Sequence, residues 1–137
     1  MAALTAHEAL IHIMVIAASA DSKVSDRELE IISRLVNRSP VFEAFDHSDL
    51  GQVAAQAIDL IKDSSNLERA MEMILGSLPH RLHDTAYALA VEVASVDLRL
   101  EQEELRYLEM IRDHLVLDGL IAAAIEASAR ARLRKAE

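Results

Sequence analysis

Four carboxylates stand at matching places in two similar segments of the chain. Asp21 is followed seven residues later by Glu28, and Asp97 is followed seven residues later by Glu104. In each segment the Asp ends one expected helix and the Glu lies in the first turn of the next, so both carboxylates point toward the turn between the helices. If the two segments pack about a pseudo-two-fold axis, the four side chains come together. Carboxylates and backbone carbonyls suit a hard divalent cation, so Ca²⁺ or Mg²⁺ is expected there rather than Zn²⁺.

The segments that carry these carboxylates form an internal repeat. Residues 17–35 read AASADSKVSDRELEIISRL, and residues 93–111 read VASVDLRLEQEELRYLEMI. Apolar positions as well as acidic ones align when the first segment is laid over the second. The alignment predicts two related helical hairpins, covering about residues 4–37 and 81–114, with a connector between them.

A purely structural role for the acidic residues is the alternative. Ser25 and Glu28 have the S-x-x-E spacing of a capping box, in which each side chain satisfies a free amide of the first helical turn. This role explains Glu28 without an ion. Glu104 is explained less well, because the aligned cap position is Glu101, a poorer cap than serine. The spacing also differs from an EF-hand, which needs ligands at loop positions 1, 3, 5 and 12 and a central glycine.

The repeated segments resemble a family motif. ASADSKVSDRELEII and ASVDLRLEQEELRYL are similar to the A-x-A-D-G-x-(apolar)-x-x-x-E motif of the tellurite-resistance TerB and TerB-like proteins. The resemblance, with its helix count and two-hairpin layout, covers nearly the whole chain. It implies an all-helical domain with an acidic, metal-binding surface that works in stress-response and membrane-associated complexes. It carries the ligand role onto Asp21, Glu28, Asp97 and Glu104.

The elements that must position these residues are helices. Apolar residues recur at helical spacing throughout, and the sequence has only three Gly and two Pro among its 137 residues. We expect a single all-α domain spanning residues 1–137, with no strands. The expected helices cover residues 4–20, 25–36, 48–62, 64–78, 81–95, 101–114 and 119–136, with a short helical turn at 41–45. The first of these is apolar almost all round, which predicts a central helix with neighbours on several sides.

Composition excludes several classes of protein. The net charge of −9 disfavours nucleic-acid binding, because such a surface repels phosphates. The longest apolar run, residues 9–20, is too short to span a membrane, and no Lys or Arg precedes it as in a signal peptide. The chain has no cysteine, which fits a reducing compartment and predicts a cytoplasmic location.

The histidines offer weaker candidates for a metal site. Glu8 and His12 stand four residues apart, a spacing that can share a metal, although a histidine inside an apolar helix is more often a hydrogen-bonded core residue. His80 and His83 lie one turn apart beside a proline, with no third ligand evident from the sequence. Glu92 interrupts the apolar fifth helix and is expected to face solvent, with a ligand or partner-facing role as the alternative.

Together these observations predict a non-enzymatic, stress-related module. Its acidic surface is expected to bind a divalent cation, a protein partner, or both. Two alternatives remain: a pure interaction scaffold without metal, and an uncharacterised carboxylate metalloenzyme. The basic residues near the C-terminus are expected to form a solvated helix end, with contact to a partner or an anionic membrane surface as the other interpretation. They are Arg130, Arg132, Arg134 and Lys135.

Overall fold

A computed structural model describes residues 4–18, 24–62, 67–94 and 102–136, with only the backbone described for residues 102–106. Within these ranges the protein is all-helical, as expected, and contains no β-strand. The α-helices are α1 (Ala6–Ala18), α2 (Asp26–Arg38), α3 (Leu50–Lys62), α4 (Leu67–Gly76), α5 (His83–Ala94), α6 (Gln102–His114) and α7 (Gly119–Leu133). Three short 3-10 helices join them: η1 (Pro40–Phe42), η2 (His47–Asp49) and η4 (His80–Leu82).

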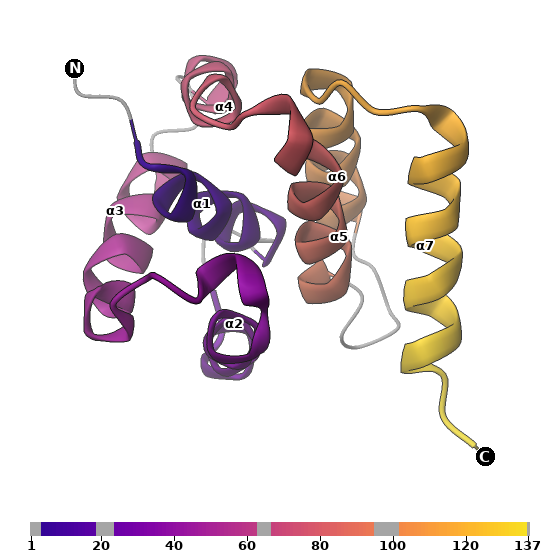
Figure 1. The fold of residues 1–137 in the computed structure, drawn as a ribbon, viewed down its shortest axis with the longest axis horizontal. Helices are drawn as coiled ribbons and strands as arrows, with labels where there is room; N and C mark the ends of the chain where they lie inside the picture. Colours follow the sequence, from indigo (N-terminus) through magenta and orange to yellow (C-terminus); the bar gives the residue numbers. More distant parts are fainter. Residues whose placement is uncertain (1–3, 19–23, 63–66, 95–101, 137) are drawn as a thin grey trace.

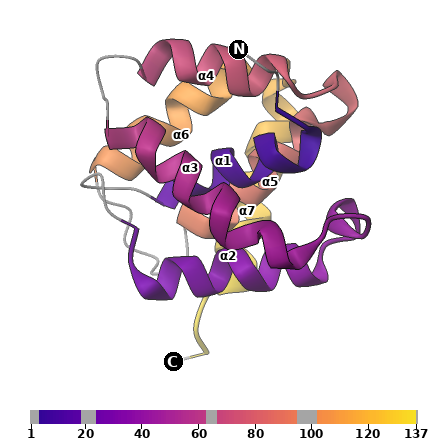
Figure 2. The same cartoon turned by 90° about the vertical axis from the view of Figure 1, so that its left-hand side faces the viewer.

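The first helix lies at the centre of the fold. Ten of the thirteen residues of α1 are buried, and the helix packs mainly against α5 and α3. Figure 2 shows α1 surrounded by α3 in front, α4 above and α2 below. A helix with apolar residues on every side needs such neighbours, because exposing any of its faces to water is unfavourable in free energy. The expectation of a central first helix is confirmed.

Side-chain caps fix where several helices begin. The expected box at Ser25 and Glu28 is present, with Glu28 Oε1 accepting from the Ser25 amide at 3.0 Å and Ser25 Oγ accepting from the Glu28 amide at 3.1 Å. Thr5 and Glu8 make the same reciprocal pair in front of α1, at 2.9 and 3.1 Å. Asp118 caps α7 by accepting from an amide of its first turn at 2.7 Å. Each cap satisfies amides that the helix leaves free.

The one histidine of α1 is a core residue. His12 is 1% exposed, and its Nδ1–H donates to the Glu8 carbonyl oxygen at 2.8 Å. Burial lowers the pKa of His12 below its usual value, with the bond to Glu8 acting in the opposite direction. The interpretation as a hydrogen-bonded core histidine is therefore confirmed, and the Glu8 carboxylate serves the helix cap instead of a metal.

Three helices surround the region of interest for function. α4 ends at Gly76, and Pro79 leads through η4 into α5. α6 packs against α4, α5 and α1, so its C-terminal end comes beside the outer face of α4 (Figure 1). Segments separated by about forty residues in the sequence thus meet at one end of the molecule.

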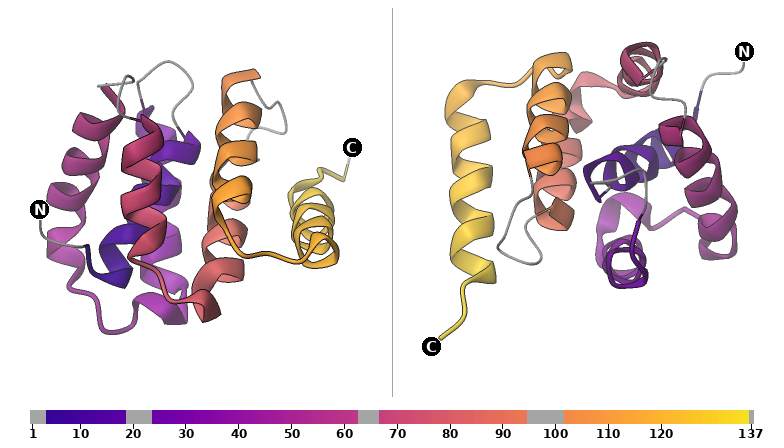
Figure 3. Two further views of the ribbon diagram at one scale, coloured as in Figure 1. Left: turned by 90° about the horizontal axis from the view of Figure 1, so that it is seen from above. Right: turned by 180° about the vertical axis from the view of Figure 1, so that it is seen from behind.

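The last helix stands at the edge of the molecule, with α5 as its main neighbour (Figures 1 and 3). Polar side chains tie it to the rest. The Tyr87 hydroxyl donates to Glu126 Oε2 at 2.5 Å, Arg112 pairs with the same oxygen at 3.4 Å, and Arg132 pairs with Glu92 at 2.5 Å. Glu92 is therefore an inward partner of α7, with its side chain only 19% exposed, and the expectation that it faces solvent was wrong. The basic end of α7 is held in part by the same pair.

No helix in the described ranges has the length and apolar character needed to cross a bilayer.

Candidate metal centre

The four carboxylates expected to bind an ion are seen only in part. Glu28 is occupied by its capping box, in which Oε1 also accepts from Ser25 Oγ at 2.7 Å. Asp21 and Asp97 lie outside the described residues. Glu104 belongs to α6, and its side chain is outside the described part of the chain. The convergence of these four residues therefore stays a prediction.

The structure brings together a different set of ligands. Glu68 and Glu72 stand one turn apart on the outer face of α4, and His114 is the last residue of α6. One ligand atom from each side chain lies within 4.8 Å of the other two. His114 Nε2 is 3.2 Å from Glu68 Oε2. The two helices thus present a carboxylate–carboxylate–imidazole cluster at the position where they touch.

A hydrogen bond outside the cluster prepares His114 as a ligand. Its Nδ1 lies 2.8 Å from the carbonyl oxygen of Met110, one turn earlier in α6. Because a carbonyl only accepts, Nδ1 carries a proton, and Nε2 is the nitrogen that faces the two glutamates and is available to a metal. Metal-binding histidines usually hold their second nitrogen in this way. The ring orientation that a metal needs is therefore set before any ion arrives.

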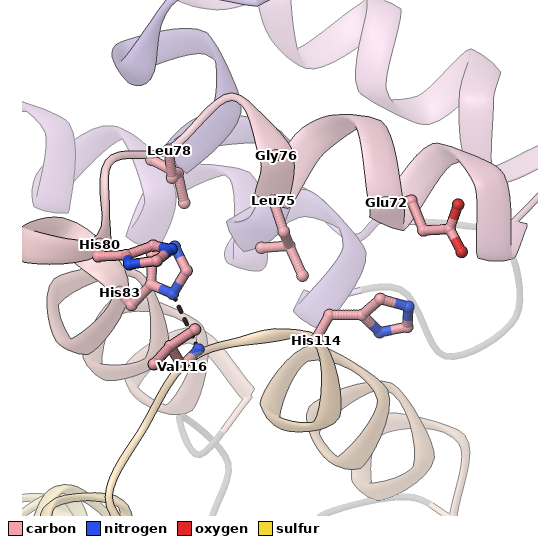
Figure 4. Close-up of a pocket in the computed structure, with 8 residues that line it drawn as sticks. All are labelled: Glu72, Leu75, Gly76, Leu78, His80, His83, His114 and Val116. Carbon is pink, nitrogen blue, oxygen red and sulfur yellow. Dashed lines mark hydrogen bonds between the residues drawn. The ribbon is translucent and has the colours of Figure 1, made fainter.

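A pocket adjoins the cluster. Its volume is about 310 Å³, and Figure 4 shows Glu72 and His114 at one end, His80 and His83 at the other, and Leu75 between them. The remaining lining comes from the turn after α4 and from the linker between α6 and α7. The full lining is Glu72, Leu75, Gly76, Leu78, His80, His83, His114 and Val116.

The histidine at the inner end of the pocket has a structural task. His83 Nδ1 accepts a hydrogen bond from the Val116 amide at 2.9 Å, so its proton sits on Nε2. This Nε2–H is buried and has no partner within hydrogen-bonding geometry. Burial lowers the pKa of His83, and the nearby Leu78 carbonyl opposes that effect. With Nδ1 committed to the Val116 amide, the ring fastens the α6–α7 linker to α5.

The donor set and its surroundings determine which ions fit. Two carboxylates neutralise a divalent cation, and the C-terminal end of α6 adds the negative end of a helix dipole beside His114. Imidazole nitrogen favours borderline metals such as Zn²⁺ or Fe²⁺ over Ca²⁺ or Mg²⁺. Tetrahedral ligands on such an ion are about 3.4 Å apart, so the cluster needs only a small contraction. The glutamates are exposed and free to make it, because the Glu68 side chain is 69% exposed.

Part of this cluster could have been found from the sequence. Glu68 and Glu72 have the i, i+4 spacing that puts two side chains on one helix face, and neither belongs to the apolar face of α4. His114 carries no such sign, because it lies 42 residues beyond Glu72 and only the packing of α6 on α4 brings it near. The sequence interpretation passed over both glutamates and gave His80 and His83 no third partner.

Comparisons of the chain with protein-family models, with curated proteins and with solved structures found no match at all. Nothing in them links the chain to the TerB family.

Proposed function

We propose that the protein is a non-enzymatic helical module that binds a divalent cation between α4 and α6. Glu68, Glu72 and His114 supply the ligands, and solvent at the mouth of the adjoining pocket supplies the rest. The observation that carries this proposal is the His114 ring. Its Nδ1–H is held by the Met110 carbonyl, while Nε2 stands among the carboxylates. A borderline metal of the Zn²⁺ type is the preferred ion, because one ligand is imidazole.

Without a metal, the same side chains form only a surface ion pair. His114 Nε2 lies 3.2 Å from Glu68 Oε2, and the Glu68 side chain is mostly exposed. Exposed pairs of this kind contribute little to stability. A bound ion would be coordinated by three side chains from two helices, and it would therefore cross-link α4 to α6. We therefore propose that metal binding stabilises the end of the molecule where these helices meet.

The wider role is part of the same proposal. The resemblance of the two repeated segments to the TerB motif is what supports a stress-response module with a protein partner, and the absence of cysteine supports a cytoplasmic location. The four carboxylates of the repeat, Asp21, Glu28, Asp97 and Glu104, remain a second candidate ion site within this proposal.

A metalloenzyme is the second candidate function, and one observation favours it. A three-ligand site leaves coordination positions for water, and here these positions adjoin a pocket of about 310 Å³. In that case the zinc-loaded protein would hydrolyse simple esters or phosphate esters faster than a His114→Gln variant does. Equal rates for the two proteins would leave the non-enzymatic module.

Isothermal titration calorimetry of the full chain tests the ion site. Zn²⁺, Mn²⁺, Ca²⁺ and Mg²⁺ are each titrated into the wild-type protein and into Glu72→Gln, His114→Gln and the control Glu109→Gln. The control changes an exposed glutamate on α6 outside the cluster. We expect Zn²⁺ to bind most tightly, and each ligand variant to lose at least about tenfold in affinity, or ~1.4 kcal/mol. The control should bind like the wild type.

Two outcomes would contradict this site. If no ion binds the wild type at millimolar concentration, the interaction scaffold without metal becomes the better interpretation. If Asp97→Asn abolishes binding while His114→Gln retains it, the ion belongs to the repeated acidic segments instead. Circular dichroism of each variant at 222 nm confirms that the fold is intact before affinities are compared.

A further inference from the structure

The outer face of α7 is apolar, and among the described residues it is exposed to solvent. Leu120 is 82% exposed, and Ala124, Ala127 and Ala131 are exposed as well. These four positions follow one another at intervals of four, three and four residues, which places them in a line along the helix. The buried residues of α7, Ala122 and Ala129, lie on the opposite side. We call the line of Leu120, Ala124, Ala127 and Ala131 the outer seam.

The helix gains little from its own domain. Only two of its fifteen residues are buried, and its main neighbour is α5. An isolated helix of this length is marginal in water. Val116, in the linker before α7, and Ile121, in the first turn of α7, add two more exposed large apolar side chains, 67% and 46% exposed. In the described residues, all exposed large apolar side chains gather at this one end of the outer seam.

Charges at the two ends of α7 are opposite in sign. Asp118 caps the start of the helix, and Arg134 and Lys135 follow its last turn. An antiparallel copy of the same helix would set each acidic end beside a basic one. Helix dipoles also favour the antiparallel arrangement, because the positive end of one helix then meets the negative end of the other. A parallel copy would instead bring like charges together.

We propose that the outer seam is the interface of a symmetric dimer, in which two copies of α7 pack antiparallel about a two-fold axis. The axis passes midway along the seam, between Ala124 and Ala127. Leu120 of one copy then lies against Ala131 of the second copy, and Ala124 lies against Ala127 of the second copy. The seam repeats as the core positions of a coiled coil do, and alanine lets the two helices approach closely.

The pairing places a large residue against a small one at each end. Leu120 fills the space that Ala131 of the second copy leaves, so the two ends of the seam are complementary in shape. Arg134 and Lys135 of each copy come beside Asp118 of the other. The dimer is isologous and closes on itself, since each copy uses the same surface. A single helix pair buries a small area, so the association is expected to be reversible and dependent on concentration.

Sedimentation velocity of the full chain tests the interface. From a few micromolar to a few hundred micromolar, the mass is expected to rise from 15.1 kDa toward twice that value. Ala127→Glu places a carboxylate in the seam and should weaken association at least about tenfold. The matched control is Ala55→Glu, which changes an exposed alanine on α3. It should associate like the wild type.

Several results would overturn the dimer. One is a mass of 15.1 kDa at every concentration, and another is an Ala127→Glu protein that associates as strongly as the wild type. Loss of association in Ala55→Glu alone would move the interface to the apolar groove between α2 and α3, which Ala55 lines. Raising the salt concentration should weaken association, because the ends of the seam carry opposite charges.

Cysteine cross-linking tests the register and direction without relying on disruption. The chain has no cysteine of its own, so introduced thiols are the only ones present. Leu120→Cys mixed with Ala131→Cys should form a disulfide-linked pair under mild oxidation. Either variant alone should not, because an antiparallel pair separates like positions by about 16 Å along the helix, too far for a disulfide. A Leu120→Cys homodimer in place of the mixed one would exclude the antiparallel seam.

Discussion

α1 and α7 are both apolar around most of their circumference, yet they occupy opposite situations. Ten of thirteen residues in α1 are buried, whereas two of fifteen are buried in α7. The difference lies in the size of the side chains. The apolar residues of α1 are mostly Leu, Ile, Met and Val, whereas those of α7 are mostly alanine, with Leu120, Ile121, Ile125 and Leu133 as its large members. Large apolar side chains lose most by exposure to water, so they determine which helix becomes the centre.

The alanines of the two helices differ in how far they are buried. It is the best helix former, and an exposed alanine costs little, so an alanine-rich stretch specifies a helix without specifying burial. Three of the four alanines of α1, Ala9, Ala17 and Ala18, are buried with its large residues. In α7 they form both the face toward α5 and the outer seam. Apolar content alone therefore overstates how much of α7 the domain can bury.

The largest predicted effect is the difference in stability between a side-chain truncation in α1 and one in α7. Ile13→Ala in α1 should lower the free energy of unfolding by about 2–5 kcal/mol, because Ile13 is fully buried and a cavity is left. Leu120→Ala in α7 should change it by less than about 0.5 kcal/mol. Urea denaturation followed by circular dichroism, at a few micromolar protein, measures both. Similar losses of unfolding free energy for the two variants would contradict this comparison. They would mean that the exposed face of α7 is buried even at a few micromolar protein.

A smaller effect concerns the polar contacts that hold α7. Arg132→Ala removes the partner of Glu92, whose second oxygen is already buried without a partner. We expect α7 to open more easily by about 1–2 kcal/mol. Hydrogen exchange read by mass spectrometry should show faster exchange in α7 while α1 stays protected.

Two controls belong to that measurement. Arg130→Ala changes a neighbouring exposed arginine and should leave the exchange of α7 unaltered. In a Glu92→Gln background, Arg132→Ala should have a smaller effect, since the charge that needed pairing is gone. Equal acceleration of α1 and α7 would show that the two helices open as one unit.

The smallest predicted effect is on acid stability, and it belongs to α1. The folded-state pKa of His12 is lowered from 6.5, so above pH 6.5 both states hold it neutral and it contributes nothing. As the pH falls below 6.5, His12 of the unfolded chain binds a proton while His12 of the folded chain stays neutral, so the free energy of unfolding falls. We expect a loss of up to about 1 kcal/mol from His12 between pH 7.5 and pH 5.5.

Urea denaturation at the two pH values checks this. His12→Asn keeps a donor for the Glu8 carbonyl but does not titrate, so it should lose less stability on acidification than the wild type. A residual loss is expected from His83, whose pKa is lowered in the same direction. The exposed His47→Asn should behave like the wild type. An unchanged pH dependence in His12→Asn would show that His12 is not the group responsible.

Much of the fold follows from the sequence because it depends on local patterns. Apolar spacing predicted each α-helix, and the capping box at Ser25 marked the start of α2. Errors occur at the ends of helices. The first helix begins at Ala6 rather than residue 4 because Thr5 is its cap, and α7 ends at Leu133 rather than residue 136. The third begins at Leu50, after η2, rather than at residue 48. The internal repeat stays a prediction.

The candidate site was less accessible to sequence reasoning. For Glu28, the capping role given as the alternative to ion binding is present, and it was accessible because a capping box is a contact within one helical turn. His114 joins Glu68 and Glu72 only because α6 packs on α4, and no local pattern reports that contact. Glu92 was placed in solvent for the same reason, because its partner lies forty residues away in α7. Contacts between distant helices are thus what the sequence alone left out.

The hydrogen bond between Tyr87 and Glu126 makes the packing of α7 on α5 sensitive to high pH. Tyr87 is almost fully buried, and burial together with the Glu126 carboxylate raises its pKa well above the usual value near 10. In strong base an unfolded chain releases this phenol proton while the folded chain keeps it, so folding weakens as the pH rises past 10. Once the proton is lost, a phenolate faces a carboxylate and the two repel. Base therefore pushes α7 away from α5, whereas acid acts on the buried histidine at the centre.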